Sequence, residues 1–418
     1  MSTKFTFASL FSGAMGLDLG LEEAGGACVF ANEIDKGAIA TMRLNRPEMP
    51  IFDDSIENLT QRKFTEMSGI AAGELDLLAG GPPCQSFSVY GNREGTLDPR
   101  GQMVFEYLRM VRELKPKTFL MENVRGLHSM PLVPKKRTND VNDFEIWMSE
   151  KGSLLQELLK GFTQAGYQAQ AFLVNSANYG APQIRERLMI LGNRLGGQAS
   201  MPKPTHSNRP EDRLPPFTSL RDVIGKDFCD PCPELMNFSA RKLRYLSMVP
   251  PGGNWRSLPV DIQKESMGKS WYLKGGRSAT WRRLSWDFPS PTVVTMPNHA
   301  STSMCHPDDL RALTVGECAA IQEFPSDWKF AGTTAEKYRQ IGNAVPVRLG
   351  KVAGDAIAKL LCDTEAQAPT DFGIPSEAHN APDVIHIRPH IRTKRYWHKG
   401  EALAGNHSYY DDDLRLFA

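Results

Sequence analysis

The N-terminal sequence Phe5-Thr-Phe-Ala-Ser-Leu-Phe-Ser-Gly-Ala-Met-Gly16 combines an apolar run with a glycine-containing turn. The apolar run from Phe5 to Phe11 predicts a buried strand. Gly13 and Gly16 permit a tight turn, and Leu17 to Glu23 has the pattern of a helix. A strand, a glycine-containing turn and a helix form a unit typical of nucleotide binding. Such a turn is also often only a tight connection, so the interpretation depends on the rest of the chain.

The next predicted strand ends beside an acidic residue. Cys28 to Ala31 predicts this strand, and Asn32-Glu33-Ile34-Asp35 follows it. A carboxylate in this position, one βαβ unit after a glycine turn, commonly binds the ribose hydroxyls of a nucleotide. A surface carboxylate is often only solvated, but this position makes Glu33 the candidate for the ribose.

A cysteine lies just past another predicted strand. The mostly apolar run Leu75 to Leu78 leads into Ala79-Gly-Gly-Pro-Pro-Cys-Gln-Ser-Phe-Ser88. The two glycines permit a tight turn and the two prolines stiffen the chain after it. The Cys84 thiol therefore lies on a rigid support at the carboxyl end of a strand, where α/β sheets bind ligands. A lone cysteine is most often a small buried hydrophobe. The polar residues after Cys84 make a poor core segment and favour a nucleophile.

A carboxylate follows the next strand. Val89 to Gly101 is polar and suits a mobile lid, and Gln102 to Leu114 predicts a helix with an apolar face. The strand Lys117 to Met121 then ends in Glu122-Asn-Val124. Glu122 should therefore emerge at the same sheet edge as Cys84.

Two arginines alternate at the start of a later strand. Val133 to Asp143 is a polar segment that we expect to be a loop, and Gly152 to Ala165 predicts an amphipathic helix. Strands are then expected at Ala169–Asn175 and Arg187–Gly192. Between them, Gln183-Ile-Arg-Glu-Arg187 places two guanidinium groups on one side of the chain. This arrangement suits a phosphate or a base better than a solvated edge.

The alternation of predicted strands and helices is absent from Arg194 to about Thr280. We expect a small irregular domain there, rich in proline, glycine, arginine and aromatic residues. Its side chains could form a basic, aromatic surface for nucleic acid, although a solvated, loop-rich face is plausible for most of them individually. The candidates are Arg241, Lys242, Arg244, Trp255, Arg256, Lys269, Trp271, Tyr272, Lys274, Arg277, Trp281, Arg282 and Arg283. Helices are expected again at Thr314–Gln322, Thr334–Gln340 and Val347–Leu361.

The composition is that of an ordinary globular protein, with 418 residues, 41% of them hydrophobic and 23% charged, enough for two or three domains. No apolar run is long enough to span a bilayer, and the first residues lack a signal-peptide pattern, so we expect a cytoplasmic protein.

Seven scattered cysteines argue against a disulfide framework. Cys229-Asp-Pro-Cys232 has no second pair at zinc spacing, so we expect no metal site. The net charge of +1 means that any basic surface is local.

These segments, in this order, resemble the motifs of the DNA cytosine-5 methyltransferases. The resemblance covers nearly everything from Lys4 to about Leu361 except the variable middle of the chain. Phe11-Ser-Gly-Ala-Met-Gly16 resembles the first motif, Glu33 lies in the second, Gly81-Pro-Pro-Cys-Gln-Ser86 resembles the fourth and Glu122-Asn-Val124 the sixth. Gln183-Ile-Arg-Glu-Arg187 resembles the eighth, Arg282-Arg-Leu-Ser with Pro289-Ser-Pro-Thr292 the ninth, and Gly342-Asn-Ala-Val345 the tenth. Met15 stands where the family usually has glycine. Asp54-Ser55-Ile56 stands where the third motif usually reads Gly-Asp-Ile, and either Asp53 or Asp54 could contact the cofactor adenine.

The resemblance implies an α/β fold, with a Rossmann-like S-adenosylmethionine-dependent methyltransferase sheet and a second, smaller, irregular target-recognition domain. The large catalytic and cofactor-binding domain would comprise residues 1–193, and the target-recognition domain residues 194–305. A hinge at 306–336, a return to the large domain at 337–362 and a C-terminal extension at 363–418 would follow.

The resemblance also implies the site and the reaction. The catalytic residues would be Cys84, Glu122, Arg185 and Arg187. The cofactor S-adenosylmethionine, released as S-adenosylhomocysteine, would be bound by Phe11, Gly13, Met15, Gly16, Glu33, Asp54, Ser55, Ile56, Gly81, Pro83, Asn343 and Ala344. The substrate would be a cytosine in a specific sequence of double-stranded DNA. We expect a prokaryotic restriction-modification enzyme that acts as a monomer in the cytoplasm, associated with the nucleoid through DNA; a cognate restriction endonuclease could act separately.

Three other functions are open to the same sequence. A tRNA cytosine-5 methyltransferase shares the core, but its Cys-Phe-Thr signature is absent and the middle domain here is long. A silent DNA-binding relative could lack Cys84 or Glu122, and both are present. A nicotinamide dehydrogenase would require a tighter Gly-x-Gly-x-x-Gly turn and has no use for Pro-Pro-Cys.

Overall fold

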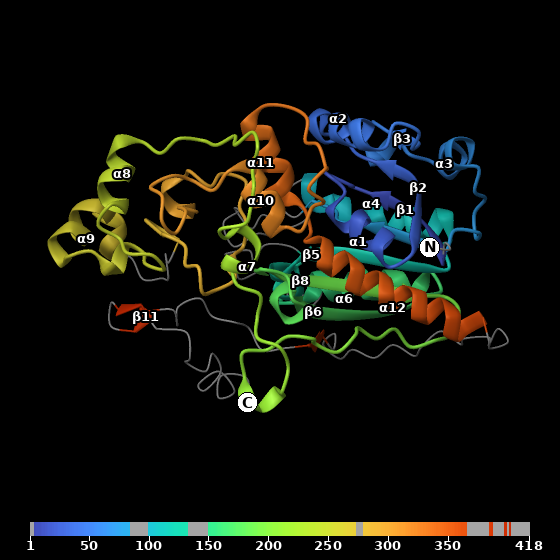
Figure 1. Cartoon of the computed structure of the whole chain (residues 1–418). Helices are drawn as coiled ribbons and strands as arrows, with labels where there is room; N and C mark the ends of the chain where they lie inside the picture. Colours follow the sequence, from blue (N-terminus) through green and yellow to red (C-terminus); the bar gives the residue numbers. More distant parts are fainter. Residues whose placement is uncertain are drawn as a thin grey trace, which may run out of the picture. The chain divides into compact units, whose positions relative to one another are not determined.

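The structure is a computed structural model, and it describes residues 4–83, 99–132, 149–272, 279–365, 384–387, 397–398 and 401–402 (Figure 1). Cys84, residues 89–98 of the expected lid and the expected loop at 133–143 lie outside these ranges. The chain divides into two compact units. The first takes its described residues from Met1–Val174, Glu186–Lys203 and Leu349–Arg388, and the second from Asn175–Arg185, Pro204–Arg348 and Pro389–Ala418.

The first unit is built on a mixed sheet whose eight described strands follow the order β10-β6-β8-β5-β4-β1-β2-β3. The strands are β1 Phe5–Leu10, β2 Gly26–Asn32, β3 Ile51–Phe52, β4 Leu77–Gly80, β5 Thr118–Val124, β6 Gln168–Asn175, β8 Glu186–Asn193 and β10 Val384–His386. β1 pairs in parallel with β2 and β4, and β4 in parallel with β5, whereas β8 runs antiparallel to β5. This mixed α/β architecture confirms the predicted fold class.

Helices cover the sheet. Those of the first unit are α1 Gly16–Glu23, α2 Lys36–Asn45, α3 Gln61–Ser68, α4 Pro99–Leu114, α6 Ser153–Gln164 and most of α12 Val347–Glu365. α12 runs beside α1 (Figure 1). A Cβ atom on Gly350 of α12 would lie 2.3 Å from the Leu17 carbonyl oxygen of α1, so only glycine permits this close approach.

The central strands are buried on both faces, which explains why their sequences are apolar rather than alternating. Ala8 and Leu10 of β1 pack into one core cluster with side chains of α3, α4 and α6, while Phe5 and Phe7 are buried as well. Within that cluster Phe119 of β5 stacks on Phe162 of α6 with ring centroids 4.2 Å apart. Burial of one such ring contributes about 1.5–3 kcal/mol.

Several boundaries differ from the sequence predictions. β4 is Leu77–Gly80 rather than Leu75–Leu78, because its residues pair with Thr118–Met121 of β5. β5 extends to Val124, because β8 pairs with it along its whole length. α4 begins at Pro99, inside the expected polar loop, where proline suits the first turn of a helix.

The C-terminal extension contributes a strand that the sequence pattern did not indicate. Val384, Ile385 and His386 form β10, which pairs in parallel with Ala171–Leu173 of β6 at the edge of the sheet. The run is only three residues long, so its pairing depends on β6 rather than on a local pattern.

The second unit is irregular. Its helices are α7 Arg221–Ile224, α8 Ala240–Leu246, α9 Val260–Met267, α10 Val315–Ile321 and α11 Thr334–Asn343, and its strands are β7 Gln183–Ile184, β9 Ser290–Pro291, β11 Trp397–His398 and β12 Glu401–Ala402. Within the described part of 194–289 there is no strand. Residues 306–348, expected to form a hinge and then to return to the large domain, group with this unit, where Tyr338 and Ile341 of α11 share a core with α10. The functional division into domains stays a prediction.

Short 3-10 helices connect these elements. They are η1 Ile56–Asn58, η3 Arg125–Ser129, η4 Ser176–Tyr179, η5 Pro210–Asp212, η6 Trp255–Ser257, η7 Gly268–Tyr272 and η8 Ala300–Thr302.

Candidate active site

The strand register of the first unit brings four predicted site segments to one edge of the sheet. Leu10, the last residue of β1, is opposite both Asn32 of β2 and Gly80 of β4. Gly80 is in turn opposite Met121 of β5. Phe11, Glu33, Gly81 and Glu122 follow these positions directly, so all four emerge where α/β sheets bind ligands.

The turn after β1 has an unusual backbone. Phe11, Gly13 and Met15 all have positive φ, at 56°, 55° and 68°. Met15 stands where the family usually has glycine, and it adopts the left-handed conformation that glycine would take freely. Its side chain is fully buried, so packing compensates for a backbone strain of about 1–3 kcal/mol. Gly16 is the first residue of α1.

Glu33 is held firmly by the backbone. One carboxylate oxygen accepts the Gly13 N–H at 2.7 Å, and the other accepts the N–H groups of Ile34 at 2.8 Å and Asp35 at 2.9 Å. These bonds join the turn after β1 to the end of β2 and fix the direction of the carboxylate. Ile34 is 66% exposed beside it and was missed in the sequence analysis. The sequence feature that could have identified Ile34 is a large apolar residue between two acidic residues, Glu33 and Asp35.

Asp54 and Asp53 have different environments. The Asn32 side chain donates to the carbonyl oxygens of Phe52 at 3.0 Å and Asp54 at 2.9 Å, which fixes the segment after β3. The Asp54 carboxylate accepts the Ser55 N–H and the Asn58 amide, whereas Asp53 forms an exposed ion pair with Arg43 at 2.6 Å. These contacts favour Asp54 as the acid of the third motif.

The two other residues of that motif have local roles. The Ser55 side chain caps η1 by accepting the Glu57 N–H. Ile56 is 2% exposed, and its side chain packs in the core cluster of the first unit. A cofactor contact by Ile56 would therefore have to involve its backbone or require movement of its side chain.

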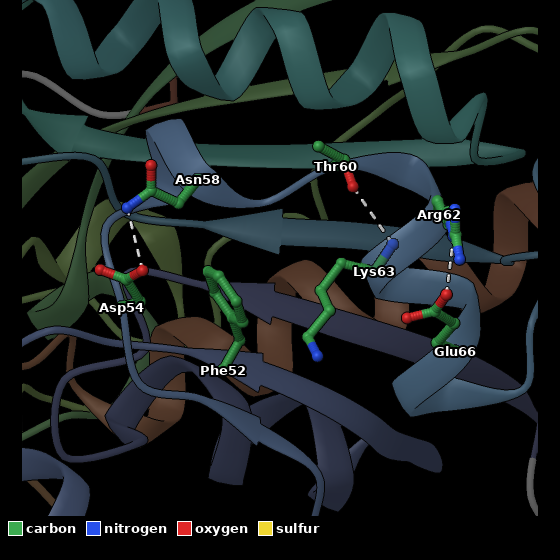
Figure 2. A pocket seen from close by; sticks show the side chains of 7 residues that line it. All are labelled: Phe52, Asp54, Asn58, Thr60, Arg62, Lys63 and Glu66. Atoms are coloured by element: carbon green, nitrogen blue, oxygen red, sulfur yellow. Dashed lines mark hydrogen bonds and ion pairs between the residues drawn. The ribbon is translucent and has the colours of Figure 1, made fainter.

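A surface pocket of about 360 Å³ lies beside this segment (Figure 2). Its lining residues are Phe52, Asp54, Asn58, Thr60, Arg62, Lys63 and Glu66. Figure 2 shows Asp54 linked to Asn58 on one side and the exposed Arg62–Glu66 ion pair on the other. The pocket shares only Asp54 with the predicted cofactor-binding residues, so we do not assign the cofactor to it.

A buried carboxyl group lies in the first turn of α1. Asp18 is fully buried, and its carboxylate is affected by a side-chain hydrogen bond with Ser9 and by repulsion from Glu22 and Glu33. Burial, the largest effect, raises the pKa of Asp18 from 3.8 to about 7. This residue was not predicted from the sequence, because its position in a helix pattern does not show that its charge is desolvated.

The predicted catalytic carboxylate and arginine meet in the first unit. The Arg187 Nε atom lies 2.7 Å from Glu122 Oε1, and both side chains are 11% exposed. The antiparallel register places Val124 opposite Arg187, so Glu122 and Arg187 are diagonal neighbours on β5 and β8. Because both side chains are largely buried, loss of either partner would leave an unpaired buried charge and would be costly.

The segment that leads to Cys84 is fitted against this ion pair. A Cβ atom on Gly81 would lie 3.1 Å from Glu122 Oε2, so Gly81 leaves room for the carboxylate. The Asn123 amide donates to the Pro82 carbonyl oxygen at 3.1 Å. Pro83 is the last described residue before Cys84. A second ion pair that sequence reasoning missed joins Arg125 to Glu186 at 3.0 Å.

Arg185 belongs to the second unit and is 2% exposed. Its guanidinium donates to the carbonyl oxygens of Val293 at 3.1 Å, Gly342 at 2.8 Å and Asn343 at 3.5 Å. These contacts tie the eighth-motif segment to the ninth and tenth. Arg185 therefore supports the Gly342–Asn343 backbone.

A second buried link reinforces this support. The Gln183 amide donates to Gln322 at 2.8 Å, and the Gln322 amide donates to the carbonyl oxygens of Ile341 and Ala344. Asn343 is exposed at the end of α11, whereas Ala344 is buried.

Part of the expected basic surface is engaged in contacts within the protein. The Arg282 side chain donates to Ser303 O, and Arg283 donates to Val249 O and Asp308 O. Lys242 is only 3% exposed. The Cζ atom of Arg256 lies 4.5 Å from the centroid of the Trp255 ring, and Lys269 is exposed. Arg256 and Lys269 therefore remain candidates for a DNA surface. Lys274 and Arg277 lie outside the described residues.

The described ranges contain no group of three His, Cys, Asp or Glu side chains that could hold a metal ion. Cys229 and Cys232 are exposed free cysteines. None of the described helices is long and apolar enough to cross a membrane.

Comparison with known proteins places the chain in a family. The model of the C-5 cytosine-specific DNA methylase family matches residues 5–359. The Type II methyltransferase M.PspPI of Psychrobacter sp. (strain TA137) is 40% identical over 367 residues, which cover 86% of this chain and 80% of the relative. The Type II methyltransferase M.Sau96I of Staphylococcus aureus is 39% identical over 351 residues, which cover 84% and 75%.

A solved structure agrees on the fold. It is the crystal structure of a prophage-encoded E. coli protein described as a DNA modification methyltransferase, with a TM-score of 0.57, 23% identity, and coverage of 86% of this chain and 99% of that one. Together with the family match, the motif order and the geometry of the sheet edge, this leads to one assignment: the chain belongs to the C-5 cytosine-specific DNA methylase family and is a DNA (cytosine-5-)-methyltransferase.

Proposed function

We propose that this enzyme transfers a methyl group from S-adenosylmethionine to C5 of a cytosine that is flipped out of a specific duplex DNA sequence, through a covalent bond between Cys84 and C6. The observation that carries the proposal is the Glu122–Arg187 pair, at 2.7 Å, packed against the Gly81-Pro-Pro segment that leads to Cys84. This arrangement supplies an acid, a cation and a nucleophile-bearing segment at one sheet edge.

The chemistry requires a nucleophile because cytosine C5 reacts poorly with an electrophilic methyl group. The Cys84 thiolate adds to C6, which gives C5 enamine character. A protonated Glu122 can donate to N3, or the carboxylate can accept from the exocyclic amine, while Arg187 orients Glu122 or binds the base carbonyl O2. C5 takes the methyl group as its bond to the cofactor sulfur breaks, which leaves S-adenosylhomocysteine. The C5 proton passes to water, and expulsion of the Cys84 thiolate from C6 restores the C5–C6 double bond.

The residues at the turn after β1 fit S-adenosylmethionine, whose role is to supply the electrophilic methyl group. The fixed Glu33 carboxylate can accept one ribose hydroxyl, because its bonds from Gly13, Ile34 and Asp35 orient it and leave one lone pair of Oε2 free for a ligand. Exposed Ile34 offers an apolar surface to the adenine, and Asp54 an acceptor. Phe11, Gly13 and Gly16 would contact the methionine end.

The remaining roles follow from the need to reach the base. A cytosine inside a duplex is inaccessible, and flipping it out costs a few kcal/mol. The segment after Cys84 would close over the flipped base, and the irregular region 194–305 would read the neighbouring bases through polar side chains in the major groove. Asn343 and Ala344 would contribute backbone contacts to the cofactor.

The Type II relatives support a place in a restriction-modification system, in which methylation protects DNA from a separately acting endonuclease. We propose a monomer that acts on DNA in the cytoplasm.

The experiment is transfer of a labelled methyl group from S-adenosylmethionine to duplex DNA, to tRNA and without an acceptor, followed by bisulfite mapping of the methylated cytosines. The proposal expects label in duplex DNA at one sequence. Labelling of tRNA alone would refute it in favour of a tRNA methyltransferase.

A further inference from the structure

A buried lysine in the second unit has no acidic ion-pair partner among the described residues. Lys242 lies in α8 and is 3% exposed. Its ammonium donates to the carbonyl oxygens of Asn298 at 2.8 Å and His299 at 2.9 Å, and lies 4.2 Å from the centroid of the Phe238 ring. Among the described residues no carboxylate forms an ion pair with it. A buried charge without a charged partner is unfavourable for stability, and an apolar side chain would fill the same space at lower cost.

The carbonyl groups that bind Lys242 belong to a tightly bonded surface turn, Met296–Thr302. Thr302 Oγ1 donates to Met296 O at 3.0 Å, and the His299 N–H donates to the same oxygen at 3.2 Å. The ring of His299 is 2.8 Å from the Ser301 hydroxyl. The turn is therefore held on its buried side by Lys242, and hydrogen bonds between its own residues hold it as well.

The outer side of this turn is accessible and chemically mixed. Met296 is 50% exposed, and His299 and Ser301 are exposed. A thioether can contact a thymine methyl group, and an imidazole and a hydroxyl can exchange hydrogen bonds with base edges or phosphates. A preorganised turn with such side chains is suited to contact with a nucleic acid.

We propose that Lys242 is a positioning residue that holds the Met296–Thr302 turn as a DNA-contacting element of the second unit. The inference rests on the proposed function, which makes duplex DNA the substrate and assigns base reading to residues 194–305, and it names one contact element within that region and the lysine that holds it. DNA phosphates near the turn would supply the negative charge that Lys242 lacks within the described protein.

This arrangement gives a signature that a purely structural lysine would not show. Burial lowers the pKa of Lys242 to about 7. The titratable groups facing it are His299 on the turn and Cys305 on the following segment, with Arg241, Arg244 and Tyr245 on α8 itself. Bound DNA would favour the protonated amine, so DNA binding should take up protons near neutral pH and weaken as the pH rises through about 7 to 8.

The test measures dissociation constants for a duplex that contains the mapped site, with S-adenosylhomocysteine present, by fluorescence anisotropy at about pH 6.5 and 8. Lys242→Met should weaken binding by about tenfold or more and lose most of the pH dependence. Its affinity for S-adenosylhomocysteine should be unchanged. Lys242→Arg should restore part of the affinity without the pH dependence, because arginine stays charged.

Lys264→Met is the matched control. Lys264 is exposed in α9 and rests over the Trp271 ring at 5.1 Å, so the same change there removes a cation without touching the turn. It should alter DNA affinity by no more than about twofold.

A folded Lys242→Met protein with wild-type DNA affinity and wild-type methylation sites would overturn the inference. If that variant does not fold, the double variant Met296→Ala with His299→Ala decides, because it alters only the exposed side of the turn, and unchanged DNA binding would refute the inference. A wild-type protein that methylates no duplex DNA would instead refute the proposed function.

Discussion

Replacement of Glu33 by alanine should weaken binding of S-adenosylmethionine by about 10- to 150-fold. The Glu33 carboxylate is fixed by three backbone N–H groups, of Gly13, Ile34 and Asp35, at 2.7–2.9 Å. A charge-assisted hydrogen bond contributes about 1.5–3 kcal/mol, and 1.4 kcal/mol corresponds to a factor of ten in affinity. Loss of one such bond to the ribose gives the predicted range, and loss of the Gly13 link would add to it by loosening the turn.

Isothermal titration calorimetry with S-adenosylmethionine and S-adenosylhomocysteine measures this effect. Glu33→Gln keeps the shape and one acceptor oxygen, so it should fall between wild type and Glu33→Ala. Glu23→Gln is the matched control, because Glu23 is an exposed carboxylate at the end of α1 in the same unit. Affinity of Glu33→Ala within about twofold of wild type would remove Glu33 from the cofactor site.

Three further outcomes follow from buried charges. The folded-state pKa of Asp18 is raised from 3.8 to about 7, so its stabilising contribution is full below about pH 4 and lost as the pH rises through 7. Asp18→Asn should therefore have a free energy of unfolding about 4 kcal/mol higher than that of wild type above pH 7. In urea titrations, the free energy of unfolding of this variant should change less with pH between pH 4 and 7. Parallel pH profiles of the two proteins would contradict this. Arg187→Met should cost about 3–5 kcal/mol by stranding Glu122 and abolish methyl transfer, and a stable, active variant would disprove the role of the ion pair. Arg185→Gln should lower stability by about 2–4 kcal/mol through its lost carbonyl contacts, a result that chemical denaturation can check.

The sequence was most informative where structure is local. The strand and turn at Phe5–Gly16 and the acid after the second strand were predictable, because hydrophobic period and glycine spacing act within a few residues. The emergence of Glu122 at the same sheet edge as the segment that leads to Cys84 also followed, since parallel strands bring their carboxyl ends to one edge.

Features that depend on distant partners were not predictable. The contact between Glu122 and Arg187 depends on the antiparallel register of β5 and β8, which no local pattern specifies. The desolvation of Asp18 and Lys242 requires the packing of several elements, and the strand β10 exists only through its pairing with β6. Lys242 was expected on a basic surface because lysine is usually exposed.

Covalent trapping on modified DNA examines the proposed bond between Cys84 and cytosine C6 itself. The substrate is a duplex with 5-fluorocytosine at the mapped target position, incubated with the protein and S-adenosylmethionine and then denatured. The fluorine cannot leave C5 as a proton does, so wild-type protein should remain covalently attached to the DNA through Cys84, and Cys84→Ser should form no such complex. Absence of the complex with an active wild-type protein, or near-normal methylation by Cys84→Ser, would contradict the covalent mechanism.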